Sequence, residues 1–118
     1  MTQGRIDVER AKALLKERLR ARMQKSGNYP ASIEGLNLYR RDDTANIEQC
    51  IYKPMIALVI RGDKRISVGS NEYACTENNV LIAGVDVPAT AIITKASASI
   101  PCMSIALILT ILCLRNWL

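Results

Sequence analysis

Short extended segments separated by turn residues fill most of the chain, and this spacing constrains the fold more than any other feature. Gly62, Gly69, Gly84 and Pro88 interrupt stretches that are apolar or that alternate polar with apolar residues. The expected strands are 33–39, 51–53, 55–60, 65–68, 73–75, 80–83, 85–87 and 89–94. Many short strands with a turn roughly every ten residues are typical of a sandwich, jelly roll or barrel. The sequence therefore predicts a mainly β domain.

Three local patterns add detail to this prediction. The apolar run 55–60 predicts a strand that is buried on both faces. Residues 61–64 predict a tight hairpin turn, because Gly62 accepts the positive φ that such a turn needs. The charged residues 40–43 predict a polar loop between two strands.

An amphipathic helix is expected at the N-terminus. Apolar residues recur at a spacing of three to four positions from Val8 to Met23, with Lys or Arg at most other positions. Asp7 is the expected cap at its start, and the segment from Ser26 to Pro30 carries the stop signals. Such a helix docks on its own barrel, on a partner subunit or on an anionic membrane surface, in that order of expectation.

The positive charge of the chain is confined to this helix. The first 25 residues hold eight Lys or Arg against three Asp or Glu, which accounts for the whole formal net charge of +5. The rest of the chain is neutral and offers no electrostatic reason to bind a nucleic-acid backbone. A solvated basic helix is the simpler interpretation of this charge.

The cysteines do not form a metal or redox motif. Cys50, Cys75, Cys102 and Cys113 are separated by 25, 27 and 11 positions, and the chain has no His. We therefore expect reduced thiols, no metal and no cofactor. The charged N-terminus lacks the features of a secretory signal, which favours a cytoplasmic protein.

No catalytic residues stand out. The sequence contains no nucleophile paired with a base, no carboxylate pair and no phosphate-binding loop at a convincing spacing. Asp42 and Asp43 are interpreted as a solvated loop, and the tripeptide 61–63 as a turn rather than an adhesion motif. Tyr52 and Tyr73 are candidates to line a ligand pocket, but the sequence does not decide which of them faces inward. The ligand-binding residues are otherwise unknown at this point.

The C-terminal segment is open to two interpretations. Residues 96–114 carry no charge, and 105–114 are apolar except for Thr110. A buried strand that runs into a terminal helix is expected, because the strongly apolar part is short for a membrane span of about 20 residues. The alternative is a small membrane-associated protein with a basic amphipathic helix and an apolar C-terminal anchor.

Several blocks of residues, in order, carry a resemblance to a known family. They are Ile33, Gly35, Leu36, Leu38, Tyr39 and Arg40; Tyr52 and Pro54 with the strand 55–60; Gly62, Asp63, Lys64 and Arg65 with Gly69 and Tyr73; and Val85, Asp86, Val87 and Pro88 with Thr94, Lys95, Ala96 and Ser97. Together they resemble the N-terminal domain of a large branch of the AraC family of bacterial transcription regulators.

The resemblance implies a cupin-like jelly-roll barrel, also described as a double-stranded β-helix, that binds a small effector and helps to pair two subunits. It also implies two helix-turn-helix motifs that read DNA and that lie beyond residue 118, so the chain is expected to be a fragment or a truncated product. Cupin enzymes hold a metal with His and carboxylate ligands, and a chain without His implies a non-enzymatic barrel. The expected organisation is a basic helix over 1–30 and a cupin-like regulatory domain over 31–118, whose end at 110–118 departs from the family.

Overall fold

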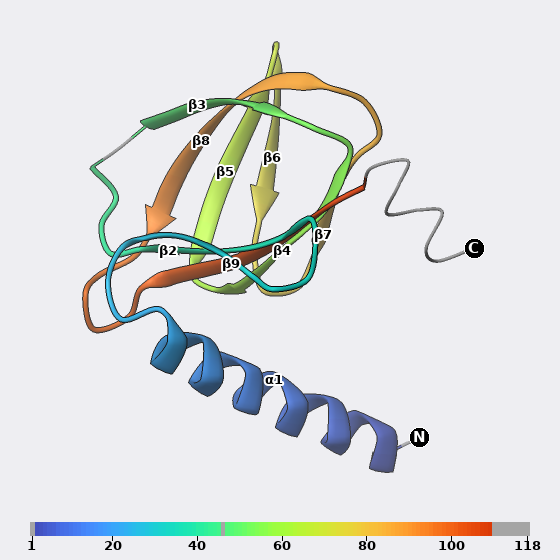
Figure 1. The fold of residues 1–118 in the computed structure, drawn as a ribbon, viewed down its shortest axis with the longest axis vertical. Coiled ribbons are helices and arrows are strands. Elements are labelled where there is room, and N and C mark those ends of the chain that lie inside the picture. Colours follow the sequence, from blue (N-terminus) through green and yellow to red (C-terminus); the bar gives the residue numbers. More distant parts are fainter. Residues whose placement is uncertain (1, 46, 110–118) are drawn as a thin grey trace.

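The computed structural model describes residues 2–45 and 47–109, in which one helix precedes a two-layered β structure (Figure 1). The helix is α1 (Thr2–Arg22). The strands are β1 (Gly27–Pro30), β2 (Leu36–Arg41), β3 (Ile47–Tyr52), β4 (Met55–Arg61), β5 (Asp63–Val68), β6 (Asn71–Cys75), β7 (Val80–Ala83), β8 (Val87–Lys95) and β9 (Cys102–Ile108). The prediction of a mainly β, cupin-like domain with an N-terminal helix is confirmed.

The strands form two antiparallel sheets that face each other. The first has the order β1-β2-β9-β4-β7 and the second the order β3-β8-β5-β6. Figure 1 shows the second sheet lying across the first, with β9 passing through the middle of the first sheet. Val59 of β4 packs with Ile66 of β5 and Ala91 of β8, so apolar side chains from both sheets form one core cluster.

The first sheet is covered on both faces because successive side chains of a strand point to opposite sides. On β2, Leu38 and Arg40 face α1, whereas Tyr39 and Arg41 face the second sheet. The same alternation occurs on β9, where Met103 packs in the cluster beneath α1 and the next residue faces the other way. One layer of strands therefore separates the helix from the interior between the sheets.

From residue 7 onward, where burial is described, α1 is buried only near its C-terminal end. Leu19 and Met23 are buried against Leu38 and Met103, whereas Val8 is 53% and Leu14 is 49% exposed. Figure 1 shows the helix leaving the sheets toward its N-terminal end. The helix was correctly predicted, but it begins at Thr2 rather than behind a cap at Asp7.

The predicted polar loop at 40–43 is wrong in its first half, since β2 continues through Arg41. Arg40 is only 7% exposed and satisfies its guanidinium locally. It donates hydrogen bonds to the Met23 carbonyl at 2.7 Å and to the Ala98 carbonyl at 3.3 Å, and it pairs with Asp42 at 2.7 Å. These partners are distant in sequence or in the adjoining loop, so the local pattern did not reveal them.

The predicted hairpin at residues 61–64 is also wrong. β4 pairs with β7 and β9, whereas β5 pairs with β6 and β8, so the chain changes sheet at this point. Irregular pairing on each side of the corner, at Val59 to Arg61 and at Asp63 to Lys64, bends the strands apart. Gly62 has a φ of +94°, and a Cβ there would lie 3.0 Å from the Cys102 Cα, so the corner requires glycine.

Other strand predictions are confirmed or corrected in detail. The turn at Gly69 joins β5 to β6 as expected. β4 is a strand but its burial alternates, with Leu58 exposed by 38%, so it is not buried on both faces. β8 runs through Pro88. The proline is tolerated there because β8 pairs with β5 only from Thr90 onward, so Pro88 lies outside that pairing.

The C-terminal apolar segment begins as a strand, as predicted. β9 pairs with β2 on one side and with β4 on the other, and Cys102, Met103 and Ala106 are buried. The predicted terminal helix lies outside the described residues. Among residues 2–45 and 47–109, no helix is both long and apolar enough to cross a bilayer.

Candidate functional site

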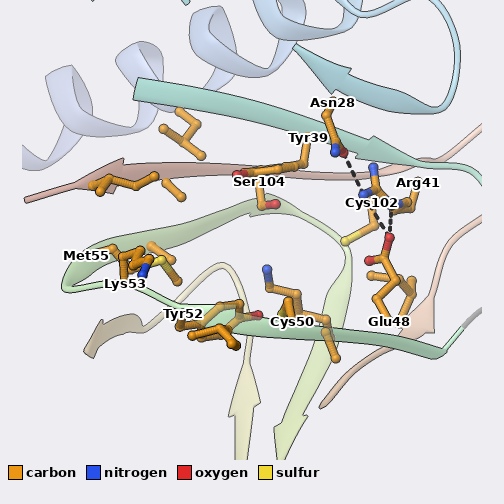
Figure 2. A pocket seen from close by; sticks show the side chains of 18 of the residues that line it. Asn28, Tyr39, Arg41, Glu48, Cys50, Tyr52, Lys53, Met55, Cys102 and Ser104 are labelled. Carbon is orange, nitrogen blue, oxygen red and sulfur yellow. Dashed lines mark hydrogen bonds and ion pairs between the residues drawn. The ribbon is translucent and has the colours of Figure 1, made fainter. Parts of the chain in front are cut away.

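A cavity of about 350 Å³ lies between the two sheets (Figure 2). Its lining comes from both sheets, with β2, β4 and β9 on one side and β3, β5 and β8 on the other. Because these strands are spread along the sequence, the cavity exists only when the two sheets are assembled.

Small side chains create the space. Ala57 of β4 and Ala106 of β9 lie directly opposite each other in the first sheet, and both are buried. Ala91 of β8 lines the second sheet, and Met55 and Ile93 complete the apolar part of the wall. Because the side chains at these alanine positions are short, the interior remains open here.

Arg41 organises the polar part of the wall. Its guanidinium pairs with the Glu48 carboxylate at 2.9 Å and donates to the Asn28 side-chain oxygen at 2.7 Å. It also donates to the Gly27 carbonyl at 3.0 Å and lies over the Tyr39 ring, 5.9 Å from its centroid. Figure 2 shows the contacts of Arg41 with Asn28 and Glu48, through which Arg41 of the first sheet joins Glu48 of the second. The cluster therefore ties the two sheets together beside the cavity.

Two tyrosines line the cavity as neutral phenols. Burial raises the pKa of Tyr39 above its ordinary value, although the nearby Arg41 charge acts in the opposite direction. Burial also raises the pKa of Tyr52, and the neighbouring Cys50 thiol adds to this effect. Both hydroxyls therefore keep their protons at neutral pH and can donate a hydrogen bond to a ligand.

The three cysteines that the structure describes are free thiols. Cys50, Cys75 and Cys102 are free cysteines, and Cys50 and Cys102 line the cavity, whereas Cys113 lies outside the described residues. Burial raises the pKa of the Cys75 and Cys102 thiols, with the positive charge of Lys64 opposing it. A thiol with a raised pKa is a poor nucleophile. Among the residues that the structure describes, no cluster of three or more His, Cys, Asp or Glu has the arrangement of a metal site.

Two lysines complete the lining. Lys53 is exposed at the rim and pairs with Asp86 at 3.1 Å. Lys64 is partly buried on β5. No carboxylate among the described residues lies within the 4.0 Å ion-pair distance of the Lys64 ammonium.

The residues singled out from the sequence fall into different places. Tyr52 lines the cavity, whereas Tyr73 is 46% exposed on β6 and does not. Asp42 pairs with Arg40, and Asp43 accepts a hydrogen bond from the Ala45 amide at 3.1 Å, as loop residues do.

Sequence reasoning missed Tyr39, Arg41 and Lys64. An available signal was the alternation in β2, where Asn37, Tyr39 and Arg41 share one face. It was hidden because the strand was expected to end before Arg40.

Comparison with known proteins gives a family and a fold. A family model described as the AraC-type transcriptional regulator N-terminus matches residues 32–118. The crystal structure of protein NMB1881 from Neisseria meningitidis is similar with a TM-score of 0.59 at 12% identity, covering 81% of this chain and 95% of that one. A chain in the crystal structure of Drosophila melanogaster CENP-C bound to CAL1 gives a TM-score of 0.55 at 13% identity, covering 86% of this chain and 98% of that one. At these identities, the two structures show a shared fold alone. No curated protein sequence matches the chain.

Proposed function

Because the chain belongs to the family of AraC-type transcriptional regulator N-termini, we propose that it senses a small effector and pairs two regulator subunits. The observation that carries this proposal is the cavity of about 350 Å³, whose wall combines apolar side chains with polar and charged groups. Small-molecule sites commonly have volumes of about 300–1,000 Å³ and this composition. In this proposal a separate helix-turn-helix domain of the full regulator contacts DNA in the bacterial cytoplasm.

Exposed apolar side chains suggest where the subunits meet. Val8 and Leu14 lie on the part of α1 that leaves the sheets, and Val80 and Ile82 lie exposed on the edge strand β7. Exposed apolar side chains favour association with another protein surface. We propose that a second copy of the chain covers this part of α1.

The arrangement of β2 and β9 offers a route from the cavity to the helix. Tyr39 and Arg41 line the cavity, while their neighbours Leu38 and Arg40 contact the docked end of α1. A ligand that shifts β2 on the inner side therefore also shifts the surface on which α1 packs. Effector binding would in this way favour one arrangement of the paired helices over another.

Filling the cavity is expected to abolish effector binding without unfolding the domain. Ala57→Leu places three additional carbon atoms in the space that a ligand would occupy. We expect at least one compound in a panel of sugars, amino acids, carboxylic acids and alcohols to raise the Tm of the original protein. A ligand at about 100 times its Kd adds about 2.7 kcal/mol of stability. The A57L protein should lose this stabilisation while its Tm without ligand changes little.

Ala74→Leu is the matched control, because Ala74 is exposed on β6 and outside the cavity. It should respond to the active compound as the original protein does. Equal stabilisation of A57L, or no response of the original protein to any compound, contradicts effector sensing in this cavity. Sedimentation velocity tests the pairing: strictly monomeric protein at micromolar concentration contradicts that half of the proposal.

A further inference from the structure

Lys64 points into the space between the sheets. Along β5 it shares a face with Ile66, which is completely buried. Its partners across the sheet are Cys75 on β6 and Ile93 on β8, and both are buried. The ammonium is close enough to lower the pKa of both the Cys75 and the Cys102 thiols, although burial outweighs it in each case. Lys64 therefore lies among buried side chains of the second sheet and near the Cys102 thiol of the first, which the charges of Asp63 and Arg41 also influence.

The other charges at the cavity already have partners. Arg41 is neutralised by Glu48, and Lys53 at the rim by Asp86. Within the described part of the chain, Lys64 is the cavity-lining cation that has no carboxylate at ion-pair distance. The lining thus carries an excess of positive charge.

A partly buried ammonium without a counter-ion is energetically unfavourable, because it loses hydration and gains no charge partner. An anionic group in the cavity would restore the missing interaction. The neutral hydroxyls of Tyr39 and Tyr52 supply further donors, while Ala57 and Ala106 present an apolar surface. The wall therefore suits a ligand with one negative charge and an apolar body.

We propose that the cavity binds a small organic acid, whose carboxylate pairs with the Lys64 ammonium and whose apolar part lies against Ala57 and Ala106. This inference rests on the proposed effector-sensing function and specifies the chemical class of the effector. The competing explanation is that the Lys64 side chain only covers apolar surface with its methylene groups while its ammonium reaches water.

Matched acids and amides separate these explanations. Hexanoate with hexanamide, and phenylacetate with phenylacetamide, differ within each pair by the negative charge and hardly in shape. Isothermal titration calorimetry should show each acid binding at least tenfold more tightly than its amide. The preference should weaken as salt is raised, because salt screens the charge pair. Inorganic phosphate should bind weakly, since it has no apolar part.

Variants assign the preference to one side chain. Lys64→Met should bring the acid and its amide to equal affinity, whereas Lys64→Arg, which keeps the charge, should retain most of the preference. Lys95→Met removes the same charge from an exposed position outside the cavity and should behave as the original protein does.

Two results overturn the inference but leave effector sensing intact: amides that bind the original protein as tightly as acids, and an acid preference that survives in K64M. The first comparison needs no variant, so it holds even if K64M fails to fold. If neither member of either pair binds, and the wider compound panel also fails to stabilise the protein, the proposed function falls together with the inference.

Discussion

Arg40→Met is expected to lower the free energy of unfolding by about 3 kcal/mol. The substitution keeps an apolar stem of similar length but removes every hydrogen bond that the buried guanidinium donates. The Met23 carbonyl at the end of α1 then loses its partner in a buried environment, and the Asp42 carboxylate loses its counter-ion. A cation at a helix C-terminus also interacts favourably with the helix dipole, and this contribution is lost. Urea denaturation followed by circular dichroism measures the change.

Arg65→Met is the control, because Arg65 is exposed and its contact with Glu72 is long, at 3.9 Å. It should change stability by less than about 0.5 kcal/mol. Arg40→Lys should fall between the two, since a single ammonium cannot reach all three acceptors. Hydrogen exchange on R40M should also show faster exchange in the last turns of α1 than in β5. A loss below about 1 kcal/mol for R40M would contradict the role assigned to Arg40.

Ile66→Ala is expected to lower the free energy of unfolding by about 2–5 kcal/mol. Ile66 is completely buried and belongs to the cluster in which Val59 of the first sheet meets Ala89 and Ala91 of the second. The other buried members of the cluster are small, so they cannot move far enough to fill the space that the shortened side chain leaves. Because this cluster joins the two sheets, its loss weakens the whole sandwich. Thermal and urea unfolding measure the effect.

Ile66→Val removes a single carbon and should lower the free energy of unfolding by only about 0.5–1.5 kcal/mol. Ile82→Ala provides the surface comparison, because Ile82 is 69% exposed on the edge strand β7. It should cost less than about 1 kcal/mol, which is the range of strand propensity. If I66A and I82A destabilise the protein equally, the two sheets are not held together by the cluster around Ile66.

The sequence predicted the elements of the fold better than their connections. Turn residues such as Gly69 act locally, so strand ends were visible without knowledge of the rest of the chain. Which strands pair is a non-local property. Gly62 has the positive φ that was expected, yet the chain uses it to pass between sheets and not to form a hairpin. The same limitation ended β2 too early, because the partners of Arg40 that allow its burial include Met23 and Ala98.

The cavity was harder to predict than the fold. A side chain in a strand lines the interior or faces away according to register, and a shift by one residue reverses every assignment. Tyr52 and Tyr73 were equal candidates in the sequence, and only the assembled sheets distinguish them. Lys64 belonged to an expected hairpin turn and was not considered as a residue of the pocket. Its inward direction follows from its place on β5, which depends on pairing with β6 and β8.

Nuclear magnetic resonance tests the central claim, that a small molecule binds between the two sheets. Amide spectra are recorded while the tightest-binding of the four acid and amide probes is added. We predict saturable shifts that are largest at Ala57, Lys64 and Ser104, which line the cavity from β4, β5 and β9, with little change at the exposed Glu72 and Tyr73. Shifts confined to exposed residues, or shifts that never saturate, would contradict the claim.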